Sequence, residues 1–285
     1  MKINNKFPIL ISEIFNILKN IKINKDIFID ATMGMAKHLK KINKKIEIKK
    51  ILAFEKDNLI FNRNKIKMKK IFIVNDNFKN IFKILKLLKI KKINFILFDL
   101  GISLFQIINK NGFSYKKNSL LDMRINNKLN KPAYKILNNY KKEKILKIFN
   151  YYRNKKYFFK IVNLIIYNRK KKEIKKTFDL INIIKKVTNK NKINNYISKI
   201  FQIIRNYINK DNLKNILKNI ILKYLYKGII IIISFHSIED NIIKNMFYKN
   251  KFKKKIKLLK IIPQKLEIFL NYKSRSSIMR IILKL

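Results

Sequence analysis

The sequence predicts an α/β fold with a largely parallel sheet, because three short apolar runs have the character of buried strands. Each run ends in a carboxylate: Ile27–Asp30, Ile51–Glu55 and Phe95–Asp99. Continuous apolar runs of this length are typical of strands buried on both faces, as in a parallel sheet. Open α/β sheets bind ligands in the crevice outside the carboxyl ends of their strands. The three acids are therefore candidate ligand contacts.

The first run leads into a turn of small residues, Asp30 to Gly34, and a helix is predicted from about Lys37. Glu55 follows this turn by roughly twenty residues, the usual offset of a carboxylate that holds a ribose diol. The spacing predicts a nucleoside-containing ligand across the strand ends. Simpler interpretations stay open, since Asp30 could cap the next helix and Glu55 could be a solvated strand-end acid.

The rest of the chain divides into two kinds of pattern. Helix and strand patterns alternate in the first hundred residues, and further strands are predicted at 71–74, 228–233 and 278–283; helices are predicted from near Ile9 and over about 77–89. From about 116 to 209, apolar residues recur every three or four positions, which indicates helices. We predict a sheet domain (1–110 and 206–285) with a helical substrate-binding insertion (111–205). The lysine-rich tract 249–257 is predicted as a loop or solvated helix face.

Composition narrows the choice of partners and compartment. The formal net charge is +53 over 285 residues, and although a bias toward A/T-rich codons explains part of it, nucleic acid is the expected partner. No apolar run approaches the ~20 residues of a membrane-spanning helix. With no cysteine and two histidines, a metal site is not expected. The cytoplasm is the simplest compartment, and a homodimer is left open.

Seven sequence blocks then resemble, in order, those of one enzyme family: Phe7–Glu13, Asp30–Gly34 with His38, Asp99–Ser103 with Gln106, Asn111–Tyr115 with Leu121–Arg124, Phe201–Arg205 with Asn209, Ser234–Asp240 with Lys244, and Asn271 with Ser274–Ser277 and Arg280. The chain resembles the bacterial 16S rRNA (cytosine-N4)-methyltransferases, which use S-adenosylmethionine. The resemblance implies a Rossmann-like class I methyltransferase sheet with an inserted helical domain. It also implies methylation of a cytidine in small-subunit rRNA near the ribosomal P site.

The resemblance implies a set of cofactor-binding residues: Asp30, Gly34, Ala36, Lys37, His38, Glu55, Phe78, Asp99 and Gln106. The chain departs from the family at Ala36 and Lys37, where the family has two glycines that let the backbone approach a ligand closely. Glu55 replaces the family's aspartate and is one methylene longer. On local sequence alone, Phe78 could equally be a core residue and His38 a surface histidine.

Catalysis of this kind requires a group that holds the weakly nucleophilic exocyclic amine of cytosine and accepts its hydrogen bonds. The segment after the strand at 228–233 supplies three candidates, His236, Glu239 and Asp240. Arginine is scarce in this chain, so its retention predicts RNA phosphate contacts, with structural salt bridges as the alternative, at Arg124, Arg205, Arg275 and Arg280. Two other functions stay open: an RNA-binding protein with impaired catalysis, and a methyltransferase acting on another amine.

Overall fold

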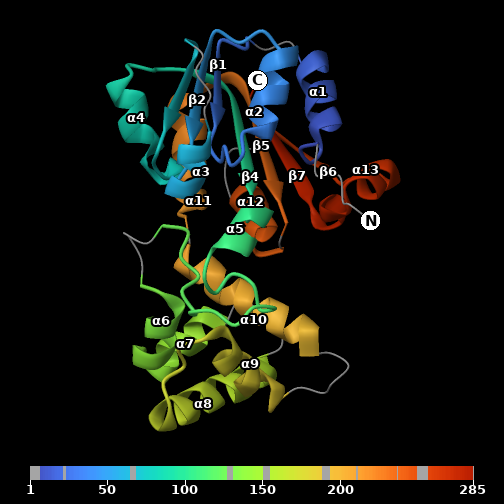
Figure 1. Ribbon diagram of the computed structural model, residues 1–285. Helices are drawn as coiled ribbons and strands as arrows, with labels where there is room; N and C mark the ends of the chain where they lie inside the picture. Colours follow the sequence, from blue (N-terminus) through green and yellow to red (C-terminus); the bar gives the residue numbers. More distant parts are fainter. Residues whose placement is uncertain are drawn as a thin grey trace. The chain divides into compact units, whose positions relative to one another are not determined.

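The computed structural model describes residues 7–21, 24–64, 69–126, 131–149, 155–187, 193–209, 211–235, 237–248 and 256–284 (Figure 1). The chain forms two compact units, which we name the sheet unit (1–101 with 212–285) and the helical unit (102–211). The boundaries lie at 101/102 and 211/212, whereas the sequence analysis put them at 110/111 and 205/206. Helix α5 (Leu104–Asn109) and the last turn of α10 (Ile193–Ile208) thus belong to the helical unit.

The sheet unit contains one seven-stranded sheet: β1 (Ile27–Asp30), β2 (Lys50–Phe54), β3 (Ile71–Val74), β4 (Ile93–Leu100), β5 (Leu225–Ser234), β6 (Ile256–Ile261) and β7 (Ile278–Lys284). The strand order is β3-β2-β1-β4-β5-β7-β6. The first five strands in this order are parallel, and β7 runs antiparallel to both of its neighbours. The strand order reverses between β1 and β4, the switch point at which doubly wound sheets bind ligands. The predicted Rossmann-like methyltransferase fold is confirmed.

Helices cover both faces of this sheet (Figure 1): α1 (Ile11–Asn20), α2 (Lys37–Lys45), α3 (Asn58–Arg63), α4 (Ile81–Leu87), α11 (Leu213–Asn219) and α12 (Ser237–Tyr248). Helix α13 (Lys265–Leu270) lies to the side of the sheet and buries none of its residues. Alternate strand residues enter separate cores because side chains alternate across a strand. Phe28 and Phe95 stack at 4.4 Å in the core that includes α1 and α2. Their neighbours Ile29 and Ile96 enter the core formed with α4, α11 and α12.

The helical unit encloses a core of its own. Its helices are α5, α6 (Ala133–Asn139), α7 (Lys142–Phe149), α8 (Lys155–Lys171), α9 (Thr177–Lys185) and α10. Residues recognised by their helical spacing, including Ile145, Ile148 and Phe149, are buried in this core with the apolar face of α10. The helical pattern predicted for this stretch is therefore confirmed.

One strand of the sheet is not predicted by the sequence pattern. Residues 256–261 form β6 at the edge of the sheet, and Ile256 and Lys257 had been assigned to a loop or helix face. The edge position explains the error, because β6 lacks the continuous apolar run that marks a strand covered on both faces. Among the described residues, no helix is long and apolar enough to cross a membrane.

Candidate functional site

The loop after β1 crosses the carboxyl ends of three neighbouring strands. Asp30 pairs with Ala53 of β2 on one side and with Leu97 of β4 on the other. Beyond it, the backbone N–H of Ala31 donates to the carbonyl of Leu97 at 2.9 Å, and that of Met33 to the carbonyl of Phe54 at 2.9 Å. Backbone hydrogen bonds thus fix the loop across the edge at which Asp30, Glu55 and Asp99 lie.

Asp30 is buried with half of its carboxylate unused. Its side chain is 1% exposed, and Oδ1 accepts a hydrogen bond of 3.2 Å from the backbone N–H of Thr32. Oδ2 has no hydrogen-bond partner among the described residues. Burial raises the pKa of Asp30 to about 7, and the charges of Asp99 and Glu55 add to the rise. Asp99 and Glu55 thus both lie close enough to Asp30 to repel its charge.

Asp99 faces His38, the second residue of α2. Asp99 Oδ2 lies 3.5 Å from His38 Nδ1, while His38 Nε2 lies 2.9 Å from the carbonyl oxygen of Ile9. A carbonyl only accepts, so the contact with Ile9 places a proton on Nε2 and leaves Nδ1 facing the Asp99 carboxylate. Asp99 Oδ1 is buried without a partner among the described residues. Burial raises the pKa of Asp99, and His38 partly opposes the rise.

Glu55 holds the glycine turn in place. Its Oε2 accepts from the N–H of Gly34 at 2.8 Å, and its Oε1 accepts from the N–H of Asp57 at 2.7 Å. Gly34 has φ +53°, a left-handed conformation that glycine adopts without steric cost. Burial raises the pKa of Glu55 to about 7. Because each carboxylate oxygen has two lone pairs, Glu55 retains the capacity to accept further hydrogen bonds.

The two residues that replace the family's glycines are placed very differently. Ala36 is fully buried and precedes α2 with φ +57°, a conformation that is costly for a residue with a Cβ. Lys37, the first residue of α2, is exposed. The alanine therefore keeps the left-handed turn despite its side chain.

Two further predicted cofactor residues have structural contacts. Phe78 is 3% exposed and packs edge-to-face on Phe98 at 5.4 Å, within the core of the sheet unit. Gln106 belongs to the helical unit, where its side-chain oxygen accepts from the N–H of Ser103 while its own N–H donates to Ser103 Oγ, a capping box at the start of α5. Their contacts with a cofactor stay predictions.

The segment after β5 carries the three predicted catalytic residues. His236 lies outside the described residues, and Glu239 lies in the first turn of α12. Asp240 forms a buried bidentate pair with Arg280 of β7: Nε donates to Oδ1 at 2.7 Å and Nη2 to Oδ2 at 3.0 Å. Arg280 thus forms the structural salt bridge that was left open as its alternative, and the predicted roles of Asp240 in catalysis and of Arg280 in RNA contact stay predictions. The salt bridge anchors α12 to the sheet.

The comparisons with known proteins agree with this arrangement. The model of the MraW methylase family matches residues 4–285. The chain belongs to the MraW methylase family. It is 42% identical, over 96% of this chain and 97% of the relative, to a protein named ribosomal RNA small subunit methyltransferase H from Buchnera aphidicola subsp. Cinara cedri (strain Cc). A protein of the same name from Mycoplasmopsis synoviae (strain 53) is 35% identical over 99% of both chains. The family resemblance predicted from the motifs is confirmed.

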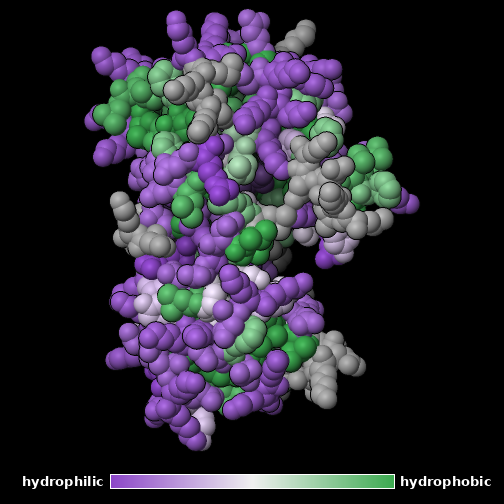
Figure 2. Space-filling view, viewed as in Figure 1, coloured by the Kyte–Doolittle hydropathy of each residue, from purple (hydrophilic) through white to green (hydrophobic). Residues whose placement is uncertain are grey.

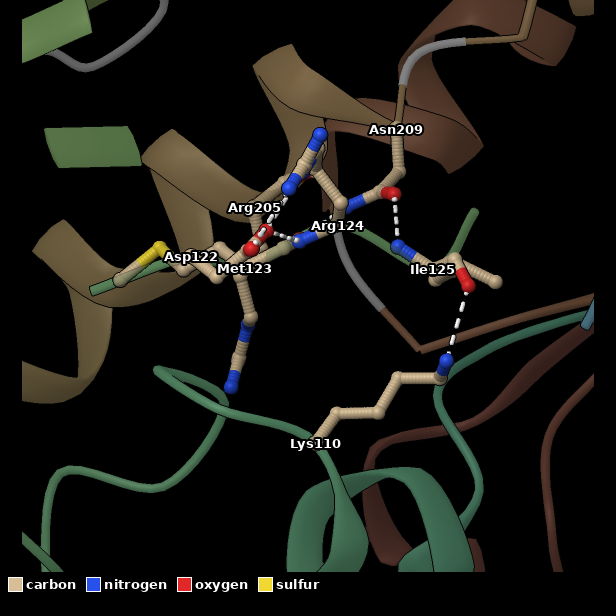
Figure 3. Close-up of polar contacts among 7 residues, drawn as sticks. All are labelled: Lys110, Asp122, Met123, Arg124, Ile125, Arg205 and Asn209. Atoms are coloured by element: carbon tan, nitrogen blue, oxygen red, sulfur yellow. Dashed lines mark hydrogen bonds and ion pairs between the residues drawn. The ribbon is translucent and has the colours of Figure 1, made fainter. Parts of the chain in front are cut away.

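Two motifs of this MraW-family chain meet inside its helical unit (Figure 3). The carboxylate of Asp122 accepts from Arg124 Nε at 2.7 Å and Nη2 at 2.8 Å. Asn209 Oδ1 accepts from the N–H of Ile125 at 2.8 Å, and Asn209 Nδ2 donates to the carbonyl of Met123 at 2.8 Å. The sequence analysis assigned no role to Asn209, which bridges the end of α10 to the Asp122–Arg124 turn.

The remaining arginines differ in exposure. Arg205 Nη1 donates to the carbonyl of Phe113 at 2.7 Å, and burial lowers the pKa of Arg205 to about 10. The guanidinium of Arg275 is exposed and lies 4.3 Å from the ring centre of Tyr272. Arg205 and Arg124 thus hold the helical unit together through the contacts above, whereas Arg275 presents its charge at the surface of the sheet unit.

Buried polar atoms also mark residues that the sequence analysis left without a role. Thr32 Oγ1 accepts from the backbone N–H of Asp99 at 2.6 Å, which ties the loop to β4. Asn271 Oδ1 and Ser274 Oγ are buried without a hydrogen-bond partner among the described residues. Both follow α13 in the block that resembles the family's carboxyl-terminal motif, which was the available signal. Within the described ranges, no group of three His, Cys, Asp or Glu could hold a metal ion.

Proposed function

We propose that this chain transfers a methyl group from S-adenosylmethionine to N4 of a cytidine in 16S rRNA, near the ribosomal P site. The observation that carries the proposal is a pair of carboxylate oxygens, Asp30 Oδ2 and Asp99 Oδ1, that lie at the switch point between β1 and β4 and find no partner in the described part of the chain. Membership of the MraW methylase family and the names of the relatives support the reaction and the rRNA substrate. The cytoplasm, where that rRNA resides, is the proposed compartment.

The acids at the strand ends suit the chemistry of this cofactor. S-adenosylmethionine presents hydrogen-bond donors, in its ammonium group and ribose hydroxyls, and carries a positive sulfonium. Ionised carboxylates only accept hydrogen bonds, so Asp30, Glu55 and Asp99 complement both the donors and the charge. Uncompensated buried carboxylates are costly, and a cationic ligand that donates to them removes that cost. When bound, the cofactor supplies an electrophilic methyl group.

The chain's own residues then have distinct tasks. Asp30 and Asp99 accept hydrogen bonds from the cofactor, and His38 holds Asp99 in place through Oδ2. Glu55 fixes the loop by binding the Gly34 N–H. The segment after β5 positions the target amine, with Glu239 as the proposed hydrogen-bond acceptor. This acceptor favours loss of the amine proton as the new bond forms, an effect typically worth ~10² to 10⁴ in rate.

The first test compares two aspartates of the sheet unit by calorimetry with S-adenosylmethionine. Asp99→Ala is expected to weaken binding at least about 100-fold, because it removes a charge-assisted hydrogen bond in a buried site. Asp26→Ala is the matched control: Asp26 precedes β1 at the opposite end of the strand and pairs with exposed Lys49 at 2.8 Å. The control should bind as the unmodified protein does. Unchanged affinity in Asp99→Ala would remove this residue from the site.

The second test identifies the reaction product. Purified protein, labelled S-adenosylmethionine and unmethylated small ribosomal subunits should yield N4-methylcytidine at one rRNA position, located by mass mapping. Transfer to another amine would replace the proposed substrate. Absence of any cofactor binding at millimolar concentration would favour an RNA-binding protein that has lost catalysis through the changes at Ala36 and Lys37.

A further inference from the structure

The carboxyl-terminal part of the sheet unit exposes apolar and basic side chains within one short stretch of sequence. Figure 2 shows apolar side chains gathered at α13. Phe269 is 85% exposed, and several of its neighbours in sequence are more than half exposed: Ile262, Leu266, Leu270 and Tyr272. Lys265 and Arg275 are exposed in the same stretch. We name Lys265, Leu266, Phe269, Tyr272 and Arg275 the α13 surface.

The α13 surface adjoins the loop that carries the strand-end site. Glu267, on α13, accepts from the backbone N–H of Leu10 at 3.2 Å and is close enough to His38 for the two charges to interact. Lys273 is close enough to Lys37 that the two ammonium groups repel each other. The segment therefore lies beside the start of α2, next to the histidine that contacts Asp99.

The chemistry of the α13 surface suits one kind of ligand. Its aromatic rings, Phe269 and Tyr272, present faces on which bases stack, and the Arg275 guanidinium already lies 4.3 Å from the Tyr272 ring centre. The only acid between residues 260 and 275 is Glu267, which is engaged with Leu10. Aromatic rings interleaved with cations are the usual composition of surfaces that bind single-stranded nucleic acid.

We propose that the α13 surface binds an unpaired segment of RNA, whose bases stack on Phe269 and Tyr272 while its phosphates meet Lys265 and Arg275. This proposal rests on the proposed function and gives it a place where RNA beside the target base is held. A second copy of the chain is disfavoured as the occupant, because a two-fold contact would bring this basic stretch against itself in a chain of net charge +53. RNA neutralises the same charges.

The sheet unit provides a matched pair for the test. Tyr226, near the start of β5, is 50% exposed, and Lys92 Nζ lies 4.2 Å from its ring centre. Tyr272 is 56% exposed with Arg275 at 4.3 Å. A cation lies over the ring of each tyrosine. Tyr226, however, lies at the amino end of a parallel strand, at the edge of the sheet opposite the strand-end acids. General attraction of RNA to a basic chain would affect both tyrosines equally.

The experiment measures the affinity of the full chain for a fluorescein-labelled, unpaired twelve-nucleotide RNA by fluorescence anisotropy. Tyr272→Ala and Phe269→Ala are each expected to weaken binding about tenfold, whereas Tyr226→Ala stays within about twofold. Tyr272→Phe should retain binding, because it keeps the ring. Arg275→Ala should reduce the slope of log affinity against log salt by about one.

Three results would overturn the proposal: unchanged binding in Tyr272→Ala and Phe269→Ala, an equal loss in Tyr226→Ala, or a dimer in sedimentation that Phe269→Asp abolishes while RNA affinity stays the same. The last result would assign the surface to a second copy. Calorimetry with S-adenosylmethionine on the same proteins separates this proposal from the proposed function. Absence of cofactor binding in the unmodified protein counts against the function alone, while the anisotropy series still decides the RNA surface.

Discussion

Aspartates in two parts of the sheet unit differ in what they contact. In the first turn of α12, Asp240 accepts two hydrogen bonds from Arg280 of β7, one on each carboxylate oxygen. At the ends of β1 and β4, Asp30 and Asp99 each keep a buried oxygen without a partner among the described residues. The difference shows that the first carboxylate is paired within the fold, and it is the basis for proposing that the other two meet a donor from a ligand.

The largest expected effect comes from breaking the occupied pair. Arg280→Met keeps much of the side-chain volume but leaves Asp240 as an uncompensated buried charge, so the free energy of unfolding should fall by about 3–5 kcal/mol. Urea unfolding at pH 7 measures the change. The double variant Asp240→Leu with Arg280→Met should recover most of the loss, since it removes both charges. Equal stability of the single and double variants would show that packing, and not charge, accounts for the effect.

A somewhat smaller effect is expected in the helical unit, where Asn209 is likewise paired within the protein. Asn209→Ala removes the acceptor for the Ile125 N–H and a donor to the Met123 carbonyl, so the free energy of unfolding should fall by about 2 kcal/mol. Asn209→Asp keeps the acceptor and loses the donor, so its free energy of unfolding should lie between those of the unmodified protein and Asn209→Ala. Urea unfolding followed by circular dichroism gives both values. A neutral Asn209→Ala would mean that water replaces the amide.

These contrasts define what the sequence could and could not predict. Continuous apolar runs identified β1, β4 and β5, because strands covered on both faces have no polar positions to interrupt the pattern. The acids that end β1 and β4, Asp30 and Asp99, could be identified for the same reason. Whether a charged residue has found a partner depends on distant parts of the chain, as between Asp240 and Arg280, forty residues apart. The edge strand β6 was not predicted, because a strand at an exposed edge does not need a continuous apolar run.

A moderate effect is expected from pH at the unoccupied carboxylates. The pKa of Asp30 in the folded protein, about 7, lies above its ordinary value of 3.8, so the folded state binds the proton more tightly than the unfolded state does. The free energy of unfolding should therefore decrease as pH rises from about 4 to 7 and stay reduced above that. Asp30→Asn should flatten this slope and raise stability at pH 8 by about 1 kcal/mol.

Urea unfolding between pH 5 and 8 measures that slope in both proteins. Part of it should remain in Asp30→Asn, because burial also raises the pKa values of Glu55 and Asp99. The raised pKa values also predict that protons are released when a cationic ligand binds near pH 6, because the ligand's positive charge favours the ionised carboxylates. Calorimetry of S-adenosylmethionine binding in two buffers of different ionisation enthalpy detects this release. A slope identical in the two proteins would contradict the assignment to Asp30.

The smallest effect concerns the backbone that carries these acids. Ala36 adopts φ +57° with its side chain fully buried, so Ala36→Gly should relieve strain and raise the free energy of unfolding by about 0.5–1 kcal/mol. Ala53, equally buried in β2, is the matched control, because glycine in a strand interior lowers stability by a similar amount. If urea unfolding shows a gain in stability for Ala36→Gly and a loss for Ala53→Gly, the loop keeps at Ala36 the left-handed turn that favours glycine. A loss of stability at both positions would mean that the methyl packing of Ala36 outweighs its strain.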